Sequence, residues 1–183
     1  MPRGKLIFIT GGARSGKSSF AEQIALNSNQ DVAYIATAQP LDEEMKERIE
    51  RHKKRRPGNW ELFEEPKEVN QLISYLGFRK GVIIIECLTL LISNLLLLKN
   101  QEELPSSKLE EDILVMTKKM VKIAYQVPAQ VLIVSNEVGM GLVPENKLGR
   151  IYRDILGQVN KIIADKADEV FFLVSGIPLK IKG

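Results

Sequence analysis

A glycine-rich loop carries the most specific chemical signal in the sequence. Residues 11–18 read GGARSGKS and match the pattern G-x-x-x-x-G-K-[ST]. Glycines let the backbone curl so that successive N–H groups point at phosphate oxygens, and the helix that follows adds its positive N-terminal end. In such a loop Lys17 bridges the β- and γ-phosphates of a nucleotide, and the Ser18 hydroxyl binds Mg²⁺. Because a strand pattern precedes the loop and a helix pattern follows it, the motif predicts binding of a nucleoside triphosphate.

An acidic residue ends another apolar run. Residues 82–85 read VIII, and Glu86 follows them. A wholly apolar run predicts a strand buried on both faces, and open α/β sheets bind ligands at the carboxyl ends of their strands. We therefore interpret Glu86 as the partner of Ser18 at a Mg²⁺ ion; the alternative is a half-solvated charge at a strand end. The sequence contains no Asn-Lys-x-Asp element of the kind that selects guanine in GTPases.

His52 is the single histidine of the chain, so any imidazole chemistry must use it. It lies near the end of a predicted helix at residues 41–56, on one stripe with Leu41, Met45 and Ile49. We therefore expect its side chain to face the protein body. Neighbouring cations disfavour the imidazolium and so favour the neutral, nucleophilic ring; here they are Arg51, Lys53, Lys54, Arg55 and Arg56.

Two interpretations of His52 stay open on this pattern. In the first, which the pattern alone favours, it is an inward-facing histidine satisfied by a backbone group. In the second, it attacks a polyphosphate held by the neighbouring cations, which suits phosphoryl or nucleotidyl transfer through a covalent phosphoramidate. Cys87 follows a buried strand without an evident basic neighbour, and we interpret it as a packing residue. One histidine and one cysteine argue against a zinc site.

The elements that must position these residues alternate along the chain. Strand patterns occur at residues 5–10, 32–36, 82–86, 130–135 and 170–174, with a short last one at 179–181. Helix patterns occur at residues 17–26, 41–56, from 107 through the stripe at 109–123, and at 147–166. Residues 57–66 and 100–105 show no regular pattern. This alternation predicts a single P-loop NTPase-like α/β domain over residues 1–183, with a mostly parallel central sheet flanked by helices.

Composition excludes several classes of protein. The 183 residues are 44% hydrophobic and 27% charged, which rules out disordered, collagen-like and disulfide-scaffold chains. A net charge of +3 is too small to imply nucleic-acid binding by itself. The most apolar stretch, residues 82–98, contains charged and polar residues and predicts a strand leading into a helix, with no membrane span and no secretory signal in the chain. The lone cysteine is typical of a reduced protein, and we expect a cytoplasmic location.

With these motifs in place, the sequence resembles a known enzyme family. The segments that carry the resemblance include TGGARSGKS at 10–18, YIATA at 34–38, HKKRRP at 52–57, ECLT at 86–89 and NEVGMG at 136–141. Together they resemble the bifunctional adenosylcobinamide kinase / adenosylcobinamide-phosphate guanylyltransferase family of cobalamin biosynthesis, over nearly the whole chain. The resemblance implies that ATP or GTP phosphorylates the aminopropanol arm of adenosylcobinamide. GMP from GTP then joins that phosphate, and pyrophosphate leaves.

The resemblance also implies roles for individual residues. His52 matches the position of a GMP-histidine intermediate. The implied nucleotide contacts are Gly11, Gly12, Ala13, Arg14, Ser15, Gly16, Lys17, Ser18, Ala36, Thr37, Ala38, Lys53, Lys54, Arg55, Arg56, Glu64 and Glu86. The implied partners are GTP, ATP, Mg²⁺ and a corrinoid substrate, in a homotrimer without nucleic acid. The leucine-rich residues 88–98 are a candidate trimer surface, though a monomer core would use them equally well.

Two alternatives to this function remain at the level of sequence. One is a simple P-loop small-molecule kinase in which His52 is structural. The other is a nucleotide-regulated nucleic-acid binder that uses residues 51–56, but this run is short, lacks aromatics and shares its helix with five acidic residues. A phosphate loop suits γ-phosphoryl transfer, whereas the histidine must reach an α-phosphate. We therefore expect the helix of His52 to move when nucleotide binds, with hinges near residues 39–40 and 57–58.

Overall fold

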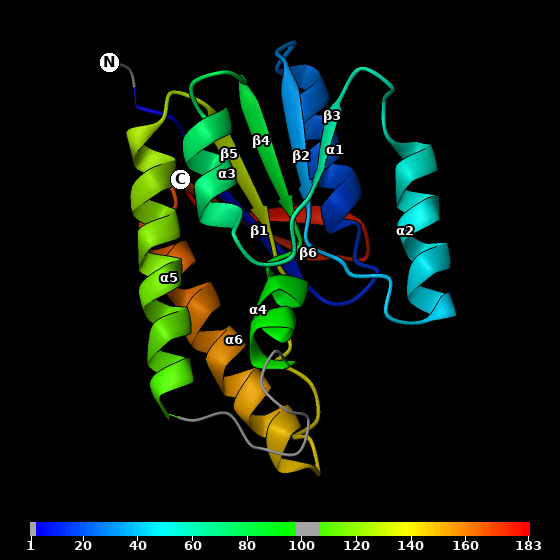
Figure 1. Ribbon diagram of the computed structural model, residues 1–183, viewed down its shortest axis with the longest axis vertical. Helices are drawn as coiled ribbons and strands as arrows, with labels where there is room; N and C mark the ends of the chain where they lie inside the picture. Colours follow the sequence, from blue (N-terminus) through cyan, green and yellow to red (C-terminus); the bar gives the residue numbers. More distant parts are fainter. Residues whose placement is uncertain (1–2, 98–106) are drawn as a thin grey trace.

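A seven-stranded sheet forms the centre of the protein, in the order β3-β2-β4-β5-β1-β6-β7 (Figure 1). The computed structural model describes residues 3–97 and 107–183, apart from the side chains of Arg48, Arg55 and Leu97. The strands are β1 (Leu6–Gly11), β2 (Val32–Ala36), β3 (Glu61–Glu64), β4 (Val82–Glu86), β5 (Gln130–Val134), β6 (Glu169–Val174) and β7 (Ile177–Lys182). All neighbours pair in parallel except β6 and β7, which are antiparallel. The mostly parallel α/β sheet predicted from the sequence is confirmed.

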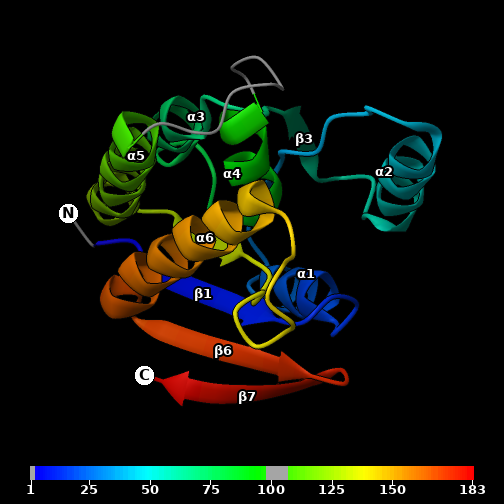
Figure 2. The ribbon, with the colours of Figure 1, turned by 90° about the horizontal axis from the view of Figure 1, so that it is seen from below.

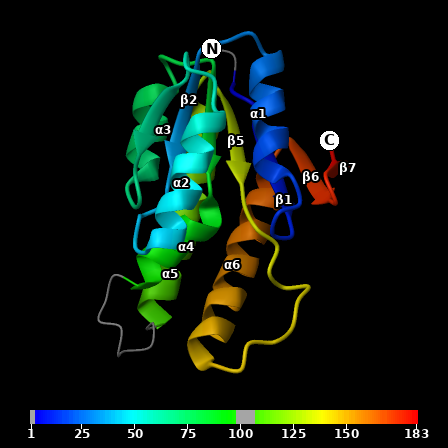
Figure 3. The ribbon, with the colours of Figure 1, turned by 90° about the vertical axis from the view of Figure 1, so that its right-hand side faces the viewer.

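Helices cover both faces of this sheet. They are α1 (Lys17–Asn27), α2 (Glu43–Arg55), α3 (Val69–Leu76), α4 (Leu88–Leu97), α5 (Ser107–Gln126) and α6 (Lys147–Lys166). Figure 2 shows α3, α4, α5 and α6 on one side of the sheet and α1 on the other. In Figures 1 and 2, α2 stands beside the sheet and is joined to it by extended segments at both ends, and in Figure 3 it lies in front of the strands. In the described part of the chain, no helix has the length and apolar character needed to cross a membrane.

The apolar strands explain the position of the core. Side chains alternate between the two faces of a strand, so Leu6 and Phe8 of β1 join one buried cluster while Ile7 and Ile9 join the other. The first cluster packs against α3 to α6, and the second against α1. The leucine-rich segment belongs to this core, since Leu88, Leu91, Ile92 and Leu96 of α4 are buried in the first cluster.

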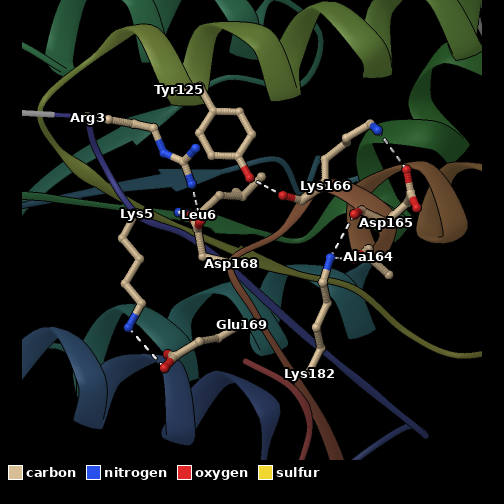
Figure 4. Close-up of polar contacts among 10 residues, drawn as sticks. All are labelled: Arg3, Lys5, Leu6, Tyr125, Ala164, Asp165, Lys166, Asp168, Glu169 and Lys182. Atoms are coloured by element: carbon tan, nitrogen blue, oxygen red, sulfur yellow. Dashed lines mark hydrogen bonds and ion pairs between the residues drawn. The ribbon is translucent and has the colours of Figure 1, made fainter.

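Polar contacts fasten β1 to β6 at their amino ends (Figure 4). The backbone N–H of Leu6 donates to Oδ2 of Asp168 over 2.9 Å, and the N–H of Asp168 donates to the carbonyl of Leu6 over 2.8 Å. Next to them, the ammonium of Lys5 lies 2.9 Å from Oε1 of Glu169. Lys180 of β7 reaches the same oxygen over 2.7 Å. One carboxylate therefore links the start of the interior strand β1 to the edge strand β7.

The sequence prediction was wrong in the segment after α2. Residues 57–66 showed no regular pattern, yet they contain β3, which pairs in parallel with Ala33 to Ala36 of β2. Three of the four β3 residues are exposed, because an edge strand has one strand neighbour and little cover. The strand therefore lacks the apolar run that identified the others. Helix α3 was also not predicted, and residues 100–105 lie outside the described residues.

Candidate active site

The glycine-rich loop connects β1 to α1, as its motif requires. Gly16 is the N-cap of α1 and has φ of +94°, a conformation that L side chains rarely adopt. A Cβ at Gly16 would lie 3.2 Å from the Cα of Gly176, in the turn between β6 and β7. That turn also donates from the Gly176 N–H to the Ser15 carbonyl over 3.0 Å. The turn of the β6–β7 hairpin therefore packs against the glycine-rich loop and stabilises it.

Lys17 folds back over the loop. Its side chain is only 7% exposed, and its ammonium donates to the carbonyl of Gly12 over 2.6 Å. A second contact of 3.5 Å joins the ammonium to Oγ of Ser15. A buried ammonium needs charge-compensating oxygens. Lys17 thus lies inside the curled loop, where phosphate oxygens can replace these acceptors.

The two candidate metal ligands meet directly. Oγ of Ser18 donates to Oε1 of Glu86 over 2.6 Å, although the two residues are 68 positions apart in the chain. Ser18 lies in the first turn of α1 and Glu86 ends β4, so both lie at the carboxyl edge of the sheet. One hydroxyl and one carboxylate fit Mg²⁺, which binds proteins through few oxygen ligands and completes its shell with phosphates and water.

A pocket lies beside Glu86, between α2 and the carboxyl ends of β2, β3 and β4. Its lining combines apolar side chains with charged ones at the rim. The lining residues are Tyr34, Ala36, Ala38, Met45, Ile49, His52, Lys53, Arg56, Glu64, Glu86, Cys87 and Leu90. The structure thus gathers His52 with six residues that the sequence resemblance implied as nucleotide contacts: Ala36, Ala38, Lys53, Arg56, Glu64 and Glu86.

Helix α2 presents His52 to this pocket. The side chain of Asp42 caps the helix by accepting from the N–H of Met45 over 2.7 Å. Met45, Ile49 and His52 then follow on one stripe and all line the pocket. The expectation for Leu41 was wrong: it precedes the helix and is 73% exposed. The stripe faces a pocket and not the core, which gives it room for a ligand.

The last turn of α2 contacts the sheet through two cations. The guanidinium of Arg56 lies over the ring of Tyr34, 4.1 Å from its centroid. The ammonium of Lys53 lies 2.7 Å from Oε1 of Glu64 and 3.7 Å from Glu50. The hydrogen bond that Lys53 donates to Glu64 raises the pKa of Lys53, and the charges of Glu64 and Glu50 add to this effect. Lys53 is therefore a cation at any physiological pH.

Thr37 shapes the pocket from behind. It is fully buried, and its Oγ1 donates to the Cys87 carbonyl over 2.8 Å and accepts from the Cys87 N–H over 2.9 Å. The backbone N–H of Thr37 donates to the carbonyl of Glu86 over 3.0 Å, and Nδ2 of Asn94 donates to the carbonyl of Thr37 over 2.8 Å. Thr37 therefore fixes the turn after β4, which aims Glu86 at Ser18.

Some predicted contacts lie elsewhere. Lys54 is exposed and is not among the residues that line the pocket, and the side chain of Arg55 lies outside the described part of the structure. Arg14 is exposed at the top of the phosphate loop with φ of +56°. Sequence reasoning missed Tyr34 and Leu90 as lining residues. Tyr34 sits in a continuous apolar strand, and nothing in that pattern separates a pocket residue from a core residue.

Comparison with known proteins decides the family. Residues 7–181 match the family described as cobinamide kinase / cobinamide phosphate guanyltransferase. The chain belongs to this family. The bifunctional adenosylcobalamin biosynthesis protein CobU of Escherichia coli is 42% identical over 181 residues, which cover 97% of this chain and 99% of the relative. CobU of Salmonella typhimurium is 43% identical over 181 residues with the same coverage.

A more distant relative agrees. The bifunctional adenosylcobalamin biosynthesis protein CobP of Pseudomonas aeruginosa is 37% identical over 175 residues, which cover 96% of each chain. The resemblance inferred from the sequence motifs is thus confirmed at the level of the family. The family description names two activities, a kinase and a guanyltransferase, and this chain has both a phosphate loop and a histidine pocket.

Proposed function

We propose that this chain carries out both reactions for which its family is described. It phosphorylates adenosylcobinamide with ATP or GTP, and it then transfers GMP from GTP to adenosylcobinamide phosphate. One observation carries the proposal: Glu86 accepts from Ser18 of the phosphate loop and also lines the pocket of His52. The proposed kinase site and the histidine pocket therefore have Glu86 in common.

The phosphate loop serves the kinase step. Its backbone N–H groups and Lys17 bind the β- and γ-phosphates, and Ser18 and Glu86 would hold Mg²⁺, which supplies charge neutralisation on the transferring phosphate. The hydroxyl of the corrinoid arm attacks the γ-phosphorus, and the bond from that phosphorus to the bridging oxygen breaks. Nucleoside diphosphate leaves, and the hydroxyl proton passes to solvent.

His52 serves the guanylyl step. A neutral ring nitrogen attacks the α-phosphorus of GTP, a P–N bond forms, and the bond to the β-phosphate oxygen breaks as pyrophosphate leaves. A phosphate oxygen of adenosylcobinamide phosphate then attacks the same phosphorus. The P–N bond breaks, the imidazole departs neutral, and adenosylcobinamide-GDP forms. Lys53 and Arg56, which line the pocket, bind the phosphates.

Finer features belong to the same proposal. Ala36, Ala38 and Glu64 contact GTP, as their place in the pocket supports. The family resemblance supports a homotrimer, which light scattering at several protein concentrations would test. The buried residues of the leucine-rich segment, Leu88, Leu91, Ile92 and Leu96, belong to the core of the monomer. The lone cysteine supports a cytoplasmic location.

Labelling with α-³²P-GTP tests the function. The wild-type chain acquires acid-labile, base-stable label, whereas His52→Ala acquires none and still phosphorylates cobinamide. Glu47→Gln, an exposed change on the same helix, is the matched control and labels as wild type. A wild-type chain that stays unlabelled is a simple P-loop kinase, and label that persists in His52→Ala assigns another nucleophile.

A further inference from the structure

Tyr34 is a buried aromatic residue that the two proposed reactions do not use. It lies in β2, is 2% exposed and lines the pocket. Its ring stacks on Trp60 with centroids 6.5 Å apart, and its hydroxyl has no hydrogen-bond partner among the described residues. Burial raises the pKa of Tyr34, and the charge of Glu86 raises it further. The ring therefore stays neutral and offers its π-face to a cation.

Arg56 is that cation, and it also contacts the backbone of His52. Its guanidinium lies 4.1 Å from the centroid of the Tyr34 ring. Its Nε donates to the carbonyl of His52 over 3.1 Å. The last carbonyls of a helix have no intrahelical donor, so this charged donor ends α2 and fixes its last turn. A chain of two contacts thus leads from β2 through Arg56 to His52.

The described part of α2 lies outside the hydrophobic core. Among its described side chains, none belongs to either core cluster. The ion pair between Lys53 and Glu64 is solvent-exposed, with 35% and 58% of the side chains accessible, and exposed pairs hold weakly. The contact between Arg56 and Tyr34 is different, because the ring beneath the guanidinium is buried and a desolvated cation–π contact is stronger.

We propose that Tyr34 is a positioning residue for guanylyl transfer: its ring seats Arg56, and Arg56 sets the place of His52 in the pocket. The inference rests on the proposed function, in which His52 attacks the α-phosphorus. Such an attack needs close alignment, since a displacement of about 1 Å can cost about a hundredfold in rate. The kinase step uses Lys17 and Ser18 of α1, so it does not depend on the position of the last turn of α2.

Two substitutions separate the ring from its hydroxyl. Tyr34→Phe keeps the π-face, and Tyr34→Leu removes it. At saturating α-³²P-GTP, Tyr34→Leu should label His52 about tenfold more slowly than wild type. Its kinase rate, measured with ATP, should stay within about threefold, because phosphate-loop contacts remain. Tyr34→Phe should label within about threefold of wild type and should unfold at an equal or higher temperature, because it loses a buried hydroxyl without a partner.

A double-mutant cycle ties the effect to Arg56. Arg56→Met should also label slowly, and Tyr34→Leu combined with Arg56→Met should be no slower than the slower single variant. The proposal would be overturned if Tyr34→Leu labelled at the wild-type rate, or if Tyr34→Phe lost as much labelling as Tyr34→Leu. It would also be overturned if Tyr34→Leu lost kinase and labelling rates in parallel, or if the labelling losses of Tyr34→Leu and Arg56→Met multiplied in the double variant. If Tyr34→Leu does not fold, Arg56→Lys decides: it keeps the charge without the planar guanidinium. Slow labelling then supports the proposal, and a wild-type rate overturns it.

A separate result would remove the basis of the inference. If the wild-type chain does not label at all, the proposed function fails, whatever the Tyr34 variants do. If the wild type labels on His52 while the variants show no selective loss, the proposed function stands and the role of Tyr34 does not.

Discussion

Oγ of Ser18 donates to Oε1 of Glu86 over 2.6 Å, and the same Glu86 lines the pocket of His52. This single hydrogen bond joins the phosphate loop to the histidine pocket. We therefore expect both proposed reactions to use Glu86, and only guanylyl transfer to use His52. Loss of Glu86 should affect both reactions, whereas loss of His52 should affect one.

Glu86→Gln tests whether Glu86 serves both reactions. It keeps the shape of the side chain but removes the charge that Mg²⁺ prefers. We expect the kinase rate at fixed MgCl₂ to fall at least about tenfold, since even outer-shell changes cost about 10–100-fold in metal affinity. Guanylyl transfer should fall as well. Titration of both rates with MgCl₂ is the measurement, and Glu111→Gln, exposed on α5, is the control. An unchanged Mg²⁺ dependence would contradict the assignment of Glu86.

Lys17→Met tests the buried ammonium. Methionine has a similar length but cannot bind a phosphate oxygen. The kinase kcat should fall by about 10²–10³, as on removal of a donor that stabilises transition-state charge. Steady-state kinetics with ATP and cobinamide measure the effect. Lys119→Met, exposed on α5, should leave the kcat unchanged. A Lys17→Met chain with wild-type kcat would show that phosphoryl transfer does not use this loop.

Trp60 provides an optical test of movement in α2. It is the only tryptophan of the chain, and it stacks on Tyr34, which in turn carries Arg56. If α2 moves when GTP binds, Arg56 and Tyr34 shift with it, and the surroundings of the indole change. We expect saturable change in tryptophan emission when GTP is added, with the same midpoint as the labelling of His52. Emission that stays constant while His52 is labelled would contradict a moving α2.

The pairing of Glu169 predicts a pH-dependent stability. The hydrogen bond from Lys180 lowers the pKa of Glu169 in the folded chain, and Lys5 adds to the shift. Because the folded pKa lies below the unfolded one, the stabilisation is present above the unfolded pKa and is lost as the pH falls through the folded pKa. Lys180→Met should therefore lower the free energy of unfolding at neutral pH by less than about 1 kcal/mol, since the lysines are exposed.

Urea denaturation of the Lys180→Met chain at neutral and acidic pH measures this difference. The cost of the substitution should vanish in acid, where Glu169 is protonated in both states. A cost that is the same at every pH would point instead to the packing of Lys180 against Phe171, whose ring centroid lies 5.8 Å from the ammonium.

The features predicted from the sequence are those that a single segment determines. The buried strands β1, β4 and β5 are continuous apolar runs, and the spacing of the glycines, lysine and serine identifies the phosphate loop. The meeting of Ser18 and Glu86 also followed, because parallel strands bring their carboxyl ends to one edge. Strand β3 did not follow, because its pairing with β2 and not its own composition makes it a strand.

The candidate site shows the same division. The helical stripe with Met45 and Ile49 predicted that His52 faces the protein body, but this pattern alone favoured a structural histidine over the pocket residue that the structure shows. Thr37 carried no local sign that its hydroxyl binds the backbone of Cys87, which is 50 residues away. Tyr34 likewise depends on Arg56 and Trp60, which come from segments distant in sequence. Such roles arise from contacts between segments that are distant in sequence, so no local pattern predicts them.

The absence of described α2 side chains from both core clusters has a consequence for natural variation. Substitutions on the pocket side of this helix should leave expression and thermal stability intact, so cellular quality control has no unfolded chain to remove. Such alleles would produce abundant, well-folded enzyme that stops after the first reaction. A strain carrying one should accumulate phosphorylated cobinamide, and its defect would escape any screen that reads only protein level.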